Sequence, residues 1–369
     1  MTAPGPLADA IRRFPLISRK RARALPLAAR LRDLADVADE ADRNNDLRAA
    51  SRVRNRAALL ATDTGQMAEA RQLCHEHAAL FLAARPLPMP YATFALEPLV
   101  NLVLLKLRCD EPDVAFDLVN TLADAVTSRT DAMLDGYLVP LADLTRPGPD
   151  HHECVEWIDS VRLYEGARAL VRAGRWDQAH AHLRQGDGIT SRIFDGHQVA
   201  VISTALGGRP AAALDLLART PHEEPWEHAV GAALTVLCQL TAGHPAVDAG
   251  EAMLAHFGRM NRAQDPLADT RLGLATVDLA TATGDTELTD RAARLTAERA
   301  TQHADAYTAR EVLQHPLIRA QLRPLDLHVL AETVEQAGLG RHGPTHEQRR
   351  QVTAALRRAD NVIVRNLPR

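Results

Sequence analysis

Two short stretches of the chain bring together side chains that can bind a metal ion or act in catalysis. One reads LCHEHAAL over residues 73–80, and the other reads PDHHEC over residues 149–154. Cys74, His77, His151 and Cys154 are all side-chain types that ligate zinc. No HExxH or CxxC spacing accompanies them, so they are weak candidates for a metal site.

The second stretch also has a purely structural interpretation, as the start of a helix. Asp150 stands where a helix N-cap is expected, and Glu153 follows three residues later, as in a capping box. Cys154 would then begin an apolar helix face that continues with Trp157 and Ile158. This interpretation needs no metal.

Motifs of nucleophilic catalysis and phosphate binding are absent from the sequence. It contains no G-x-S-x-G, no G-x-x-x-x-G-K-[ST], and no G-x-G-x-x-G after a strand. We therefore expect a protein that is not an enzyme and holds no cofactor. A helical-repeat enzyme or metalloprotein that uses the His/Cys clusters remains the alternative.

The amino-acid composition limits the fold classes and the cellular compartments that we expect for this protein. The 369 residues are 46% hydrophobic but only 4% aromatic, which favours a nearly all-helical protein packed through small residues. The net charge of −4 makes nucleic acid an unlikely main partner. The four cysteines are far apart, and neither a signal peptide nor a long apolar run is evident, so we expect a cytoplasmic protein without membrane segments.

A repeat appears when residues 163–183 are compared with residues 197–217. Three positions recur with the same offset of 34 residues: Gly174 and Gly208, Ala179 and Ala213, Leu183 and Leu217. Glycine allows the chain to reverse between two helices, and alanine lets the helices approach closely. A helix-turn-helix period of 34 residues is typical of tetratricopeptide repeats.

The chain thus resembles the tetratricopeptide repeat family, most clearly over residues 159–225. The resemblance implies an all-α solenoid, a right-handed superhelix of helical hairpins. It predicts a basic arm and first helix over residues 1–35, a repeat domain over 36–325 with an interruption near 123–150, and capping helices over 326–369. The arginine-rich composition fits a high-GC bacterial genome, such as an actinobacterial one.

The repeat register also predicts where the first cysteine points. Cys74 stands at the twenty-fourth place of its repeat, where the matched units have Leu183 and Leu217. We therefore expect its side chain in the core between helices. His77, one turn further along, is not explained by the register.

The same register predicts a binding groove. In the family, certain places on the first helix of each hairpin reach a bound peptide, and here they correspond to Arg52, Asn55, Tyr164, Arg168, Arg172 and Gln198. Arginine pairs with carboxylates in a bidentate way. The resemblance implies an adaptor or regulatory protein that binds an acidic or carboxylate-bearing segment of a protein or peptide partner.

An arginine-rich N-terminal stretch, which includes Arg12, Arg13, Arg19, Lys20 and Arg21, leaves another function open. A basic arm of this kind can contact nucleic-acid phosphates, as in a ligand-responsive transcriptional regulator. A solvated basic arm without that role is the simpler interpretation. The sequence does not predict the oligomeric state.

Overall fold

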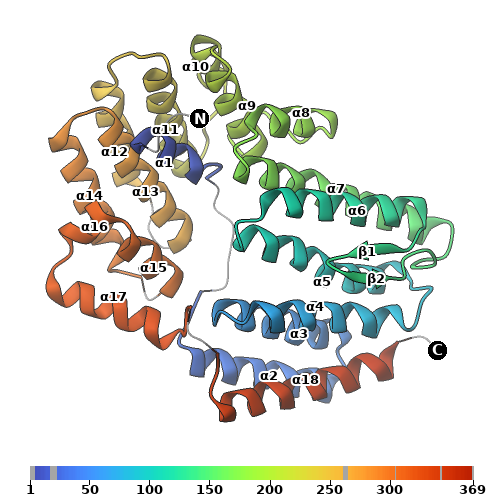
Figure 1. Ribbon diagram of the computed structural model, residues 1–369. Helices are drawn as coiled ribbons and strands as arrows, with labels where there is room; N and C mark the ends of the chain where they lie inside the picture. Colours follow the sequence, from blue (N-terminus) through green and yellow to red (C-terminus); the bar gives the residue numbers. More distant parts are fainter. Residues whose placement is uncertain (1–4, 17–22, 261–264, 304, 341–342, 368–369) are drawn as a thin grey trace. The chain divides into compact units, whose positions relative to one another are not determined.

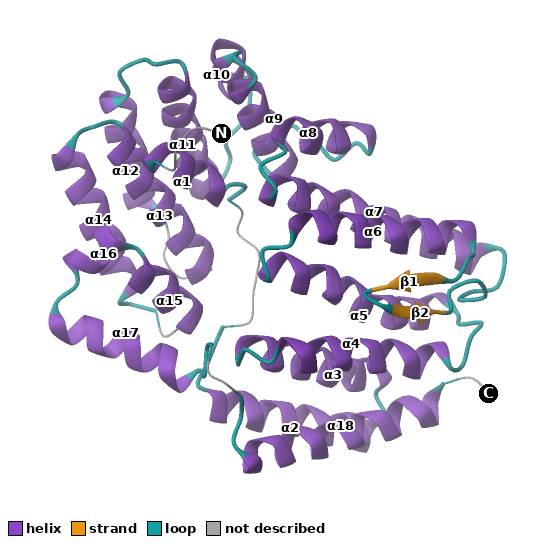
Figure 2. Ribbon diagram, viewed as in Figure 1, coloured by secondary structure: helices purple, strands orange, loops and turns teal. Residues whose placement is uncertain are grey.

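The computed structural model describes residues 5–16, 23–260, 265–303, 305–340 and 343–367. Within these ranges there are eighteen helices and two short strands, so the prediction of an all-α protein is confirmed (Figures 1 and 2). No helix in these ranges is long and apolar enough to cross a membrane. Arg19, Lys20 and Arg21 of the basic arm lie outside the described residues.

The chain forms two compact units, each built from two separate stretches. Unit 1 comprises Met1–Leu25 and Gly174–Ala337, and unit 2 comprises Pro26–Ala173 and Gly338–Arg369. The predicted repeat domain over residues 36–325 spans parts of both units.

Unit 2 contains seven helices and the strand pair in the described residues. Its elements are α2 (Leu27–Asn44), α3 (Leu47–Asp63), α4 (Met67–Leu82), α5 (Met89–Arg108), α6 (Pro112–Ser128), β1 (Ala132–Leu134), β2 (Tyr137–Val139), α7 (Pro149–Arg172) and α18 (His346–Asn366). Each helix contacts its neighbours in the stack.

Unit 1 begins with the N-terminal helix and continues with a second run of hairpins. Its helices are α1 (Pro6–Arg13), α8 (Trp176–Gln185), α9 (Asp195–Leu206), α10 (Pro210–Ala218), α11 (Pro225–Thr241), α12 (Val247–Arg259), α13 (Pro266–Ala282), α14 (Thr286–Ala300), α15 (Ala306–Gln314), α16 (Pro316–Gln321) and α17 (Pro324–Gln336). Successive helices contact one another, which is compatible with a helical repeat.

Each hairpin reverses at a residue with positive φ. These residues are Gly65, Asp110, Gly174, Gly208, Gly243 and Gly284. Asp110 has φ of 60° at the place where the repeat register expects glycine. Aspartate is one of the few other residues that adopt this conformation readily, so the departure from the sequence pattern leaves the turn intact.

The small and large residues of the repeat pack as their register predicts. Ala179 and Ala213 are fully buried, while Leu183 and Leu217 are 1% and 5% exposed. Aspartate side chains begin several helices by accepting a hydrogen bond from a backbone N–H of the first turn, as Asp46 and Asp285 do. Local capping and close helix contacts therefore both favour the hairpin stack.

The interruption near residues 123–150 contains a β-hairpin. No strand was predicted for this stretch from the sequence. β1 and β2 pair in antiparallel fashion, with Leu134 opposite Tyr137. Asp135 and Gly136 form the two-residue turn, with φ of 51° and 88°, as in a type I′ turn.

The last helix of unit 2 packs against its first two. α18 contacts both α2 and α3. Arg54 of α3 binds the carboxylate of Asp360 with two hydrogen bonds of 2.6 and 2.8 Å, and Arg358 lies 3.1 Å from Asp39 of α2. The helix that the sequence predicts as a cap therefore lies against residues that precede it by some three hundred positions.

Candidate functional site

The two cysteines of the His/Cys clusters are buried in the core of unit 2. Cys74 is 1% exposed, as its repeat position predicts, and Cys154 is fully buried. Burial raises the pKa of the Cys74 thiol to about 12 and that of Cys154 to about 11. Because the thiolate is the form that attacks or binds a metal, neither cysteine is prepared for such chemistry at neutral pH.

The two histidines of the clusters make ordinary internal contacts. His77 is 1% exposed, and its Nε2 lies 3.2 Å from Ser51 Oγ on α3. His151 Nδ1 lies 3.4 Å from Thr145 Oγ1. In the described part of the chain, no three His, Cys, Asp or Glu side chains are grouped so that they could hold a metal ion.

The predicted capping box at Asp150 is not present, and this prediction was wrong. α7 begins at Pro149, so its N-cap is Gly148, two residues before the predicted one. Proline is favoured at the first helical position because it has no N–H to satisfy. The Asp150 carboxylate instead accepts a hydrogen bond of 3.1 Å from the backbone N–H of Met89, the first residue of α5, and so caps a different helix.

The predicted groove residues of unit 2 lie on the first helices of its hairpins. α3 contacts α5, and α5 contacts α7, so these helices form one layer. Arg52 on α3 is exposed and has no ion-pair partner among the described residues. Asn55 donates to Glu97 Oε2 over 3.2 Å and accepts from Asn101 over 3.1 Å, both on α5. Burial raises the pKa of Glu97.

The α7 part of this layer carries three of the predicted residues. Tyr164 is 44% exposed. Arg168 lies 2.8 Å from Glu165, and Arg172 lies 3.2 Å from Asp110. The Arg172–Asp110 pair is exposed on both sides, and such pairs contribute about 0.2–1 kcal/mol, so a ligand carboxylate can replace Asp110 at little cost. Glu165 is only 16% exposed, so the Arg168–Glu165 pair is partly buried.

Gln198 belongs to unit 1 and is already engaged. It is fully buried, and its side-chain amide binds the backbone of Leu16: Oε1 accepts from the Leu16 N–H over 2.7 Å, and Nε2 donates to the Leu16 carbonyl over 2.7 Å. A second hydrogen bond of 2.9 Å runs from Nε2 to the Ile193 carbonyl. The position where the sequence predicts contact with a partner peptide thus binds a peptide segment of the chain itself.

This N-terminal segment, residues 5–16, lies on the first helices of unit 1. α9, α11 and α13 contact one another in sequence, and α1 contacts α13 and α11. Arg13 pairs with Asp278 of α13, which also lies 3.0 Å from His315 Nε2. Ala10, Phe14 and Leu16 are each at most 5% exposed. The segment is therefore held by its backbone, its charge and its apolar side chains.

Replacing Gln198 with leucine is expected to lower the free energy of unfolding by about 2–4 kcal/mol. The substitution leaves the N–H and carbonyl of Leu16 buried without partners, and each such group costs about 1–3 kcal/mol. Urea denaturation checks the stability, and hydrogen exchange at the Leu16 amide checks the location. Gln336→Leu is the matched control, because the Gln336 side chain donates to Glu332 on an exposed helix face. Equal effects of the two substitutions would refute the role of Gln198.

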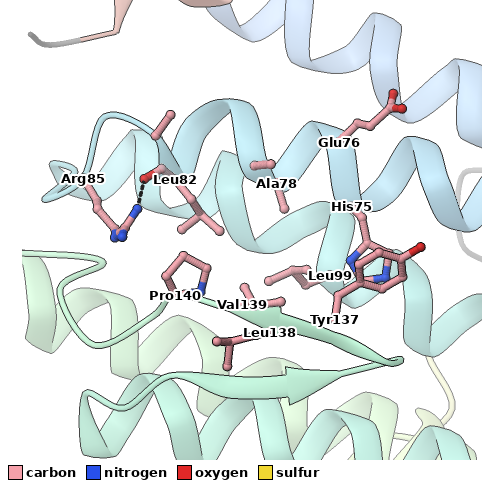
Figure 3. A pocket seen from close by; sticks show the side chains of 12 residues that line it. His75, Glu76, Ala78, Leu82, Arg85, Leu99, Tyr137, Leu138, Val139 and Pro140 are labelled. Carbon is pink, nitrogen blue, oxygen red and sulfur yellow. Dashed lines mark hydrogen bonds between the residues drawn. The ribbon is translucent and has the colours of Figure 1, made fainter.

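The β-hairpin adds a pocket that the sequence analysis missed. We call it the trough; it lies between α4 and β2 and has a volume of about 370 Å³. Its walls are mostly apolar and include Ala78, Ala79, Leu82, Leu99, Val139 and Pro140. Figure 3 shows Arg85 at one end and the His75 and Tyr137 rings at the other. The signal in the sequence was the Asp-Gly pair of MLDGYLV, flanked by apolar residues, which is typical of a hairpin.

Asp135 anchors the tip of this hairpin. Its side chain is 4% exposed and accepts a hydrogen bond of 2.6 Å from Arg71 Nε. Lys106 Nζ lies 3.5 Å away, and His75 Nε2 lies 3.6 Å away. Burial alone would raise the pKa of Asp135, but the hydrogen bond and charge of Arg71, together with Lys106, outweigh it and lower the pKa. The hairpin is thereby fixed to α4 and α5.

No protein-family model matches the chain, and neither a curated protein nor a solved structure matches it.

Proposed function

We propose that this protein is a non-enzymatic helical-repeat protein of the tetratricopeptide kind that binds a peptide segment of a protein partner. The observation that carries the proposal is the N-terminal segment on the first helices of unit 1. There Gln198 recognises peptide backbone, and Asp278 pairs with an arginine of the segment. The first helices of a stack in this chain can therefore hold a peptide.

The partner segment that we propose for unit 2 is acidic or carries a carboxylate. Arg52, Arg168 and Arg172 are at least partly exposed on the layer of first helices. The partners of Arg168 and Arg172 are carboxylates of the same chain, Glu165 and Asp110, which supports the proposal that these guanidinium groups bind a carboxylate of the partner. An adaptor or regulatory role in the cytoplasm of a bacterium fits this proposal.

Replacing Arg168 and Arg172 together with glutamate is expected to weaken partner binding by at least about 100-fold. Each lost charge-assisted contact corresponds to about 1.5–3 kcal/mol, and the new carboxylates repel an acidic segment. The measurement is affinity capture from extract of the native host, followed by mass spectrometry. Captured proteins are then titrated against the purified wild type and variant.

The control carries the same change of charge on other helices. Arg184 and Arg219 are exposed, on α8 and at the end of α10, so Arg184→Glu with Arg219→Glu is expected to leave capture intact. Circular dichroism verifies that both double variants keep their helicity. Capture that survives Arg168→Glu with Arg172→Glu would refute the proposed site.

A further inference from the structure

The outer edge of β2 offers one unused pair of backbone hydrogen-bonding groups. Leu134 and Tyr137 flank the two-residue turn, and Met133 lies opposite Leu138. In such a hairpin the pair beside the turn exchanges both hydrogen bonds, and the next pair exchanges none. The N–H and carbonyl of Leu138 therefore point away from β1. Among the described residues they have no hydrogen-bond partner.

These groups face the trough. β2 lies between β1 and α4, as Figures 1 and 3 both show, so the edge that points away from β1 points towards α4. The Leu138 side chain is 66% exposed. An unpaired strand edge with large exposed apolar residues is the arrangement to which an extended peptide adds as a further strand.

The dimensions of the trough suit a short extended peptide. From His75 to Leu82 the floor follows eight residues of α4, which span roughly 10 Å at the helical rise of about 1.5 Å per residue. Three residues of an extended chain span about the same length, at about 3.3 Å each. The small side chains of Ala78 and Ala79 leave room above the helix, and the apolar walls suit apolar side chains.

The two ends of the trough differ in charge and closure. At one end, His75 and Tyr137 close it, with ring centroids 4.1 Å apart. At the other end, Arg85 donates from Nε to Asp143 over 2.7 Å and from Nη1 to the Leu82 carbonyl over 2.6 Å. No hydrogen bond from its Nη2 to another described residue is present, so this nitrogen can donate to a ligand carboxylate.

We propose that the trough binds an extended apolar peptide with a free C-terminal carboxylate, which adds as a strand beside β2. Leu138 supplies the backbone hydrogen bonds, and Arg85 binds the carboxylate. Because β2 runs from the Tyr137 end towards the Arg85 end, the peptide runs parallel to it. The anchoring of Asp135 by Arg71 and Lys106 holds this edge in place before the ligand arrives, which reduces the entropy lost on binding.

The proposal uses residues other than those of the acidic-segment site. Arg168→Glu with Arg172→Glu is therefore expected to leave binding in the trough unchanged. The failure of one proposal can thus be told apart from the failure of the other.

The central variant is Leu138→Pro in the full chain. Proline removes the N–H that faces the trough, replaces a side chain that lines it, and leaves the hydrogen bonds between β1 and β2 in place. Met133→Pro is the matched control, since Met133 lies opposite Leu138, is 60% exposed, and has its N–H on the other edge of the hairpin. Ala79→Trp, at an exposed position of α4, fills the trough without changing the backbone.

The probes are two sets of N-acetylated pentapeptides that are randomised at every position. One set has a free C-terminal carboxylate, and the other has a C-terminal amide. Affinity selection and mass spectrometry identify the retained peptides. We expect the wild type and Met133→Pro to enrich free-carboxylate peptides whose last three residues are apolar. Leu138→Pro, Ala79→Trp and Arg85→Gln are each expected to reduce this enrichment at least 10-fold. The wild type is expected to enrich the amidated peptides no more than these variants enrich the free-carboxylate peptides.

Three results would overturn the proposal. One is that the wild type enriches no peptide of this class. Another is that enrichment survives both Leu138→Pro and Ala79→Trp. The third is that sedimentation shows a dimer of the wild type that Leu138→Pro dissociates, because a second copy of the chain would then occupy the edge of β2.

Discussion

Replacing Asp269 with alanine is expected to lower the free energy of unfolding of unit 1 by about 3–5 kcal/mol, the largest effect that we predict for a single substitution. Asp269 on α13 pairs with Arg299 on α14, with 3.0 Å between Arg299 Nε and Asp269 Oδ2. The two residues are 3% and 1% exposed. Without the carboxylate, the guanidinium charge stays buried and its main counterion is lost.

The other groups around Arg299 do not neutralise its charge when the Asp269 carboxylate is removed. Arg299 also donates to the carbonyls of Phe257 and Met260, over 3.0 and 3.3 Å, and its guanidinium lies 4.6 Å from the centre of the Phe257 ring. These groups carry no net charge. Changing both members of the pair, with Asp269→Leu and Arg299→Met, is therefore expected to recover most of the stability, because no charge remains buried.

Urea denaturation followed by circular dichroism measures these effects. Glu251→Ala is the control, since Glu251 pairs with Arg291 at the surface, where both side chains are nearly half exposed. Its denaturation midpoint is expected to stay at the wild-type value. If Asp269→Ala shifts the midpoint no further than Glu251→Ala does, the buried pair does not stabilise unit 1.

Acidification is expected to destabilise unit 2 through His77. Burial, and then the charge of Arg54, lower the pKa of His77 to about 3, whereas an unfolded chain has a histidine pKa of about 6.5. Between these values the unfolded state binds the proton and the folded state does not. The free energy of unfolding therefore falls as the pH drops below about 6.5, by about 1.4 kcal/mol per pH unit, and the loss is complete near pH 3.

A substitution separates the contribution of His77 from that of other groups. His77→Asn keeps a polar side chain near Ser51 but removes the titrating ring. Its free energy of unfolding, measured in urea from pH 7.5 to pH 4.5, is expected to depend less on pH than that of the wild type, by about 2.7 kcal/mol over this range. His152→Gln is the control, because His152 is 79% exposed. Parallel pH profiles for wild type and His77→Asn would contradict the prediction.

Local sequence patterns were sufficient to predict the hairpin stack and its core. Apolar periodicity and the 34-residue offset depend on residues that are close in the chain, so they are visible in one sequence. The burial of Cys74 could be predicted because its repeat position faces the neighbouring helix. Asp110 kept the hairpin turn because aspartate tolerates positive φ.

The same local patterns could not predict contacts between residues that are far apart in the sequence. Gln198 was expected at an open surface because nothing near it in the sequence indicates Leu16, which lies 182 residues away. The β-hairpin did have a local signal, the Asp-Gly pair, but its strands of three residues are too short for the alternation that usually marks a strand. The trough depends on where that hairpin packs, and the sequence carries no local sign of this.

The packing of α18 against α2 and α3 has a consequence for how the protein is made. Arg54 and Asp360 are 306 residues apart, so at about 5–20 residues per second a ribosome needs roughly 15–60 s to synthesise the partner after the arginine. During that time the faces of α2 and α3 that α18 will cover stay exposed to solvent or to chaperones. Unit 2 can complete its core only after α18 has been translated.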